Sequence, residues 1–235
     1  AADGGDELLA ASPEIRSLVE ACERAGAAEG EEPRYEVGLA ETLDIPFVAD
    51  MVEESFVRLL ERRKADEESN PLAGMWNGWV TFSERQLTLG SLRQRLARFM
   101  EFPSLRRPNG LSRDEWSLGI VLMPRGGVAG EVEPAAYFEL CLLPEGRRGP
   151  TPYLQNLCVS RKLQRRGLGQ RMLSLAEAIA RDGWRGKKVH LHTDDDEAAV
   201  GIYTRNGYKI RAREVNSGET KVYMIKDLDL VDEKA

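Results

Sequence analysis

Apolar residues recur at two different spacings along the chain, and the spacing separates helical segments from extended ones. Between residues 15 and 22 they recur every three to four positions, as on a helix with one apolar face. Ser12 can cap this helix, and Pro13 suits its first position. Glycines and a glutamate-rich stretch follow the helix. We therefore predict an acidic helical leader over residues 1–34 and one folded domain over residues 35–235.

Beyond the leader, the pattern predicts a short strand at Tyr35–Leu39 and then an amphipathic helix that Asp44 can cap. The apolar stripe of that helix consists of Val48, Met51, Val52, Phe56, Leu59 and Leu60. A second amphipathic helix is predicted from Ser91 through Leu92, Leu96 and Phe99. The surrounding segment, residues 65–116, has little periodicity and includes Trp76 and Trp79. We treat it as an extension of the domain.

Extended segments dominate the second half of the chain. Strands are predicted at residues 118–123, 135–143, 153–159, 188–193, 208–213 and 221–226, with Pro144 ending the second one and a loop at 146–150. Helices are predicted at residues 198–205 and directly after the strand at 153–159, the latter with Leu168, Met172, Leu175, Ala176 and Ile179 on its inner face. A strand, a helix and a further strand in this order form a parallel pair with a crossover helix. The fold class is therefore α/β, with a mixed sheet.

Composition and charge indicate which classes of protein this chain can belong to. The 235 residues are 42% hydrophobic and 31% charged, which is typical of a soluble globular chain. The net charge of -6 argues against nucleic acid as the main partner. No stretch is long and apolar enough to span a bilayer. Three scattered cysteines suggest no disulfide framework and favour a reducing compartment. The first residue is not methionine, so excision, a chosen boundary or removal of a transit peptide are all open.

The turn after the strand at 153–159 carries the most informative chemistry. It reads Gln164, Arg165, Arg166, Gly167, Leu168, Gly169 and opens directly into a helix. Unpaired backbone N–H groups and a partial positive charge make the first turn of a helix an anion site. The two glycines allow a phosphate to approach the backbone. The third glycine of a Rossmann fingerprint is absent, because residue 172 is methionine, and no Gly-Lys-Ser/Thr of a P-loop follows. A tight turn with solvated arginines is the alternative reading.

Two motifs together resemble the GNAT superfamily of N-acetyltransferases. The turn at 164–169 is similar to the family signature Gln/Arg-x-x-Gly-x-Gly/Ala, and residues 199–208 resemble a second signature, Ala-x-x-x-Tyr-x-x-x-Gly-Phe/Tyr. The resemblance is strong over residues 150–228, looser over 35–143, and excludes the leader and 65–116. It implies a mostly antiparallel sheet with one parallel pair, and acetyl-CoA as co-substrate without a metal. Residues 152–159 further resemble plastid enzymes of plants and algae.

The resemblance also implies roles for individual residues. Leu157, Cys158 and Val159 would hold pantetheine and polarise the thioester through their backbone. Arg165, Arg166, Gly167, Leu168, Gly169 and Gln170, together with Gln164, would bind the pyrophosphate. Tyr203 would protonate the departing thiolate. One position departs from the family pattern, since Asp196 stands where asparagine is common. Its carboxylate could accept a hydrogen bond from CoA or cap the helix, but it adds negative charge beside an anionic ligand.

The base that takes the amine proton is open at this point. Tyr153 and His192 occupy positions similar to a tyrosine and histidine pair in some protein N-terminal acetyltransferases, and histidine titrates in a suitable range. His190 lies on the same strand face as His192, so either may equally be a plain sheet residue. Glu139 on the preceding strand is the alternative base.

These predictions lead to acetyl transfer from acetyl-CoA to a primary amine, on protein N-termini or lysine side chains. The alternative is a catalytically silent subunit that serves as a scaffold or acyl-CoA sensor in a larger complex, with the leader or residues 65–116 binding a protein partner. A small-molecule amine is a third kind of acceptor. The resemblance favours the plastid stroma as the location, with the cytoplasm as the alternative.

Overall fold

The computed structural model describes residues 8–55, 90, 117–145, 149–216 and 219–228. Three predictions fall outside these residues: the helix starting at Ser91, the Trp76 and Trp79 segment, and the far end of the helix stripe from Phe56 onward. Among the helices that are described, none is both long and apolar enough to cross a membrane.

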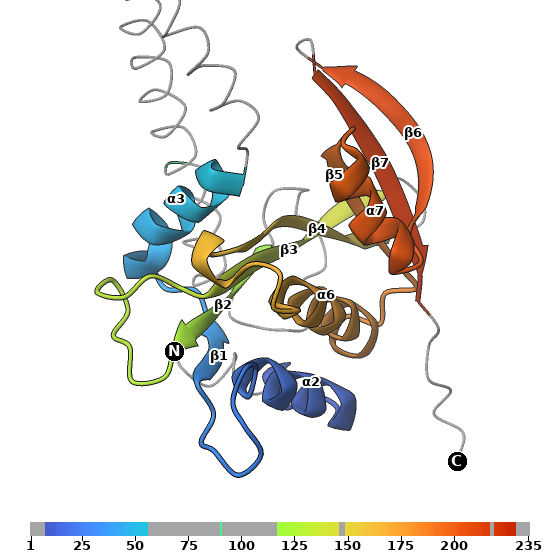
Figure 1. Cartoon of the computed structure of the whole chain (residues 1–235). Coiled ribbons are helices and arrows are strands. Elements are labelled where there is room, and N and C mark those ends of the chain that lie inside the picture. The colour runs from blue at the N-terminus through green and yellow to red at the C-terminus, as the bar shows by residue number, and fades with distance from the viewer. Residues whose placement is uncertain (1–7, 56–89, 91–116, 146–148, 217–218, 229–235) are drawn as a thin grey trace, which may run out of the picture.

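A seven-stranded mixed sheet forms the centre of the fold, in the order β1-β2-β3-β4-β5-β7-β6 (Figure 1). Its strands are β1 (Tyr35–Leu39), β2 (Ser117–Pro124), β3 (Ala136–Glu145), β4 (Gly149–Val159), β5 (Lys188–Asp194), β6 (Lys209–Asn216) and β7 (Glu219–Asp227). Only β4 and β5 are parallel to each other, and every other neighbouring pair is antiparallel. The predicted fold class, with its single parallel pair and crossover helix, is confirmed.

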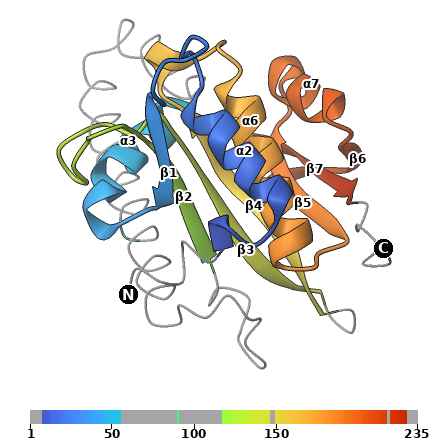
Figure 2. The ribbon, with the colours of Figure 1, turned by 90° about the horizontal axis from the view of Figure 1, so that it is seen from below.

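Helices cover both faces of the sheet. The crossover helix α6 (Leu168–Ala178) and the leader helix α2 (Pro13–Glu23) lie side by side on one face, whereas α3 (Ile45–Ser55) lies on the other (Figures 1 and 2). The side chains alternate accordingly along the strands. Leu154 and Leu191 join the core under α6, while Tyr137 and Cys158 join the smaller core under α3. The predicted inner face of α6 is buried, and so are Ile179 and Ala180, which begin the π-helical turn that follows α6.

The leader helix α2 shares the main core. Ile15 and Cys22 are fully buried there, and the helix starts as predicted, with the Ser12 hydroxyl accepting a hydrogen bond from the Ile15 N–H at 3.0 Å. The Ser12 hydroxyl also donates to Asp182, 170 positions later in the chain, at 2.7 Å. Arg181 pairs with Glu14 at 2.7 Å. The leader helix is therefore joined to the π-helical turn η4 (Ile179–Gly183) by both apolar and polar contacts.

The prediction that Pro144 ends the strand at 135–143 is wrong. The loop predicted at 146–150 is wrong at Gly149 and Pro150, which belong to β4, and its residues 146–148 lie outside the described residues. The strand β3 runs on to Glu145, and Pro144 lies opposite Pro150 of β4. Pairing of β3 with β2 stops at Cys141. Within the described residues β3 has a neighbour on one side only beyond that point, so a residue without an N–H is tolerated there.

Asp44 lies one step before the helix it was predicted to cap. It ends the short turn η1 (Thr42–Asp44), and its carboxylate accepts a hydrogen bond from the Glu41 N–H at 2.8 Å. The carboxylate thus closes a capping box within η1, and α3 follows from Ile45.

Candidate active site

The predicted phosphate turn connects β4 to α6 and is open to solvent. Arg165 and Gly167 both have left-handed backbones, with φ of 61° and 79°. Glycine adopts this conformation without strain, whereas arginine is rarely found in it. Gly167 is the N-cap of α6, and no side-chain cap hydrogen bond is found at this helix start. Because Gly167 has no side chain, it cannot cap the first backbone N–H groups of α6, which is the arrangement that an anion site requires.

The side chain of Gln164 holds the turn against the end of β4. Its amide donates to the Val159 carbonyl at 3.2 Å, so Gln164 shapes the turn from the β4 side. Gln170 does the same from the opposite side, because its amide group exchanges hydrogen bonds with Asn206 at the end of α7 (Glu197–Arg205). These two contacts fix the start of α6 relative to both β4 and α7.

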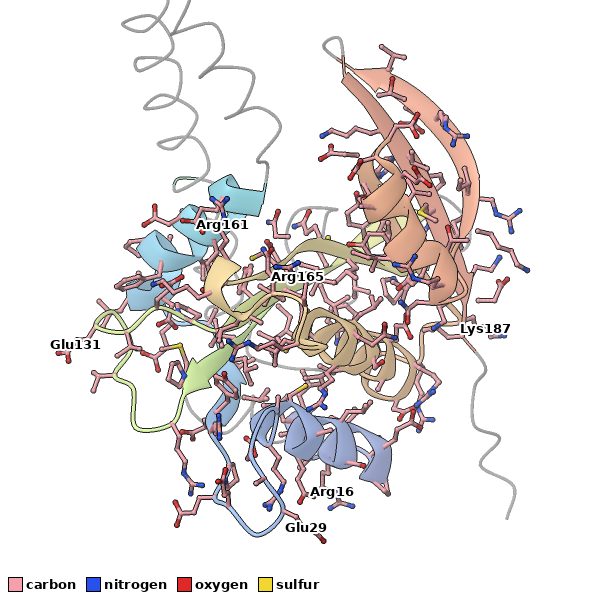
Figure 3. The ribbon with its side chains drawn as sticks, viewed as in Figure 1. Arg16, Glu29, Glu131, Arg161, Arg165 and Lys187 are labelled. Carbon is pink, nitrogen blue, oxygen red and sulfur yellow. The ribbon has the colours of Figure 1, made fainter. Side chains whose placement is uncertain are left out.

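The segment from residue 161 to 171 contains a run of five basic residues, which differ in their contacts: Arg161, Lys162, Arg165, Arg166 and Arg171. Arg161 and Arg165 lie along the exposed connection between β4 and α6, and Figure 3 shows both there. Lys162 lies 3.3 Å from Glu133, and the lysine side chain is 83% exposed, so this ion pair is weak. Arg171 points away from the turn and donates to the Ala21 carbonyl of α2 at 2.7 Å. Arg171 therefore anchors the leader helix.

The parallel strands β4 and β5 pair over a short distance and then separate. Their register joins only Tyr153 with His190 and Leu154 with Leu191, although β4 continues to Val159 and β5 to Asp194. The backbone of Leu157–Val159 is thus outside any ladder on the β5 side. This unpaired part of β4 ends at the phosphate turn, so the turn and the opening between the two strands are adjacent along the chain.

A bulge in β4 lies at the same opening. Tyr137 pairs with Cys158 and Glu139 with Gln155, so two β4 residues, Asn156 and Leu157, lie opposite a single β3 residue. Asn156 has a left-handed φ of 53°. The extra residue displaces the β4 backbone at the segment predicted to polarise the thioester.

The proposed base residues are brought into direct contact. The Tyr153 hydroxyl and the His192 Nδ1 atom are 2.8 Å apart. His192 stacks on Tyr223 of β7 with ring centroids 4.9 Å apart, and its Nε2 atom lies 3.5 Å from the Glu214 carboxylate. The His192 side chain is 33% exposed, so a proton that reaches it can pass to solvent.

His190 belongs to the same row of side chains but is buried. Its Nδ1 atom lies 2.5 Å from the Tyr223 hydroxyl. The shared face of the two histidines is therefore as predicted, and their environments differ. Tyr223 connects them, and sequence reasoning missed it because its position opposite His192 follows from the register of β5 with β7.

Tyr203 lies on α7, half-buried against the core and edge-on to Tyr208 at a centroid distance of 5.6 Å. Burial raises the pKa of Tyr203 to about 12, with a contribution from Cys158. Burial alone raises the pKa of the Cys158 thiol to about 12. Both groups therefore keep their protons at neutral pH. Tyr203 can donate a proton, and Cys158 is unsuited to act as a nucleophile.

Asp196 is the N-cap residue of α7, but its side chain makes no capping hydrogen bond. The two preceding acids form ion pairs, Asp194 with Lys221 and Asp195 with Arg213. In the described parts of the chain, no group of three or more His, Cys, Asp or Glu side chains could hold a metal ion. The phosphate turn and the Tyr153 and His192 pair offer anion binding and proton transfer at this opening.

Comparison with known proteins agrees with this architecture. Residues 90–208, half of the chain, match the family model described as Acetyltransferase (GNAT) family. A chimera of spermidine N-acetyltransferase SpeG from Vibrio cholerae and hSSAT is 12% identical, with a TM-score of 0.51 over 83% of this chain and 95% of its own.

Two further structures are similar at lower scores. The NatC complex bound to Gag peptide and CoA is 15% identical, with a TM-score of 0.45 over 60% of this chain and 80% of that one. Escherichia coli ElaA is 17% identical, with a TM-score of 0.39 over 58% of this chain and 87% of its own. No curated protein matches the sequence. The family match, together with the mixed sheet and its single parallel pair, shows that this chain belongs to the acetyltransferase (GNAT) family.

Proposed function

We propose that this protein transfers the acetyl group of acetyl-CoA to a protein amine, either an N-terminal α-amino group or a lysine ε-amino group. The observation that carries the proposal is the 2.8 Å contact between the Tyr153 hydroxyl and His192, beside the opening between β4 and β5. A protein built only to bind acyl-CoA would not need a proton acceptor at that place.

The cofactor would bind along the path from the phosphate turn to the strand opening. Backbone N–H groups at the start of α6 would meet the pyrophosphate, with Arg165 and Arg166 adding positive charge. The acyl arm would then follow the free backbone edge of Leu157–Val159. Asp196 lies at the start of α7, and its carboxylate would disfavour nearby phosphate.

The reaction would proceed by direct attack within a ternary complex. A neutral amine nitrogen attacks the thioester carbonyl carbon, and the β4 backbone N–H groups stabilise the oxyanion that forms. Tyr153 and His192 accept the amine proton, directly or through a water. The intermediate then expels the CoA thiolate, which takes a proton from Tyr203. An acetyl-cysteine route is disfavoured, because burial raises the pKa of Cys158 to about 12.

The test combines activity with product identity. The protein is incubated with acetyl-CoA and a proteome-derived peptide mixture, and mass spectrometry distinguishes α-N from ε-N acetylation. His192→Gln and Tyr153→Phe should lower turnover by about 100-fold or more, as loss of a general base does, while acetyl-CoA affinity stays within about threefold. A parent protein that binds acetyl-CoA but acetylates neither peptides nor spermidine would instead be a silent scaffold. Acetylation of spermidine alone would indicate a small-molecule acceptor.

The cellular setting is part of the same proposal. Cys22, Cys141 and Cys158 are all buried and form no disulfide with one another, which agrees with a reducing compartment such as the plastid stroma or the cytoplasm. A protein partner would bind through the outer face of the leader or through residues 65–116. Imaging of the tagged full-length protein and co-purification test these two points.

A further inference from the structure

A buried carboxylate lies directly beneath the bulge of β4. Glu139, in the middle of β3, is only 1% exposed and accepts a hydrogen bond from the Asn156 side-chain amide at 3.0 Å. A charged group taken out of water is costly unless hydrogen bonds replace the water. An apolar residue would be cheaper to bury at this position, so we expect the Glu139 carboxylate to have a specific role.

Asn156 is the residue that makes the bulge. Its φ of 53° lies in the left-handed region, which asparagine tolerates better than most non-glycine residues. The hydrogen bond to Glu139 holds its side chain against β3 and opposes a return to the extended conformation. The two residues act as one unit, which we call the bulge lock.

The bulge determines which face of the sheet each later side chain of β4 occupies. With one extra residue in β4, Cys158 faces the core under α3, while Leu157 and Val159 pack against the core under α6. Loss of the extra residue from the ladder would turn each of these side chains to the opposite face and shift the backbone N–H groups with them. The lock thus sets the orientation of the segment proposed to hold the thioester.

We propose that Glu139 and Asn156 are positioning residues, whose hydrogen bond fixes the β4 bulge and thereby aims the backbone N–H groups of Leu157 and Cys158 at the acetyl carbonyl. This inference rests on the proposed function. It also gives Glu139 a role other than that of base, because a base must reach the amine, and Glu139 is buried and engaged by Asn156.

The lock is tested by variants that separate hydrogen bonding from charge. Glu139→Gln keeps an oxygen that can accept from Asn156 and should retain turnover within about threefold, with an unchanged pH profile. Asn156→Ala removes the donor and the tolerance for a left-handed backbone, and should lower kcat by about tenfold or more with little change in the KM for the amine. Asn156→Gly restores the backbone freedom without the donor and should be intermediate. Glu36→Gln, on the edge strand β1, is the matched control for removal of a carboxylate charge, since Glu36 is exposed.

A binding measurement makes the test independent of the acceptor. CoA lacks the acetyl carbonyl, so the ratio of acetyl-CoA to CoA affinity reports on the N–H groups that the bulge aims. Asn156→Ala should lower this ratio and leave CoA affinity near the parental value, with thermal unfolding confirming that the variant is folded. An unchanged ratio in a folded Asn156→Ala variant overturns the inference. Loss of both turnover and the pH dependence in Glu139→Gln also overturns it, because that pattern identifies a base. If the parent binds neither ligand, the proposed function fails as well, which is a distinct outcome.

Discussion

Replacement of Ile15 by alanine tests whether the leader helix is part of the cooperative core. Ile15 is fully buried in the cluster that also contains the inner face of α6, so its side chain leaves a cavity when truncated. Truncation of a buried isoleucine to alanine costs about 2–5 kcal/mol. In a domain of this size, about 1 kcal/mol lowers the Tm by about 2–4 °C, so a loss of about 3 kcal/mol should lower it by about 6–12 °C.

The assay follows thermal and urea unfolding by circular dichroism and by tryptophan fluorescence. Arg16→Ala is the matched control, because Arg16 is the next residue of α2 and lies on its exposed face (Figure 3). It should change stability by no more than about 0.5 kcal/mol. If Ile15→Ala unfolds at the same midpoint as Arg16→Ala, the leader is an appendage that unfolds separately and the reasoning about a shared core is refuted.

Three further predictions follow from the site and its surroundings. Tyr203→Phe should lower kcat by about 100-fold, which is at the low end of the effect of a general acid, and should leave acetyl-CoA affinity unchanged. In the parent, turnover should not decline near about pH 10, where an ordinary tyrosine ionises, because burial raises the pKa of Tyr203 to about 12. Cys22 and Cys158 each have a pKa raised by burial from 9.0 to about 12, so the stability they contribute is complete below pH 9 and is lost as pH rises toward 12. Each thiol should lower the free energy of unfolding by on the order of 1 kcal/mol per pH unit in that window, which is measurable as a falling urea midpoint. Cys22→Ala should make this fall less steep. Arg171→Met should lower stability but leave acetyl-CoA affinity unchanged, whereas Arg165→Ala should weaken affinity and spare stability; the reverse pattern in calorimetry and thermal unfolding would contradict the assignment of these two arginines.

Local pattern was sufficient to predict most elements of the fold. Alternation and glycine-rich turns placed the strands, and the apolar face of α6 was read correctly from its spacing. The wrong predictions concern a position where the neighbouring strands determine whether the strand continues. Pro144 looks like a strand end in isolation. In the part of the chain that the structure describes, β3 has only β4 beside it beyond Cys141, so Pro144 needs no N–H on the other side.

The candidate site was predictable only in part, for a related reason. The phosphate turn is a contiguous sequence and could be read directly. Asn156 in the middle of a strand was a signal for a bulge, since asparagine is uncommon in strands and tolerates a left-handed backbone. Its partner Glu139 and the stacking of Tyr223 on His192 depend on register, which the sequence pattern does not define. The contact of Arg171 with Ala21 depends on where the leader helix lies. The sequence alone therefore could not distinguish Arg171, which contacts the leader, from the basic residues at the phosphate turn.

A direct titration of acetyl-CoA tests the central claim that the turn at 164–169 binds the cofactor. Calorimetry on the parent should give saturable binding at one site. A Cβ at Gly169 would lie 3.6 Å from the Val159 side chain, an ordinary contact, so Gly169→Ala should fold and bind nearly as well as the parent. Gly169→Trp would fill the space in front of the first N–H groups of α6 and should weaken binding by more than about tenfold, or about 1.4 kcal/mol. A folded Gly169→Trp variant that binds acetyl-CoA as tightly as the parent would contradict the assignment.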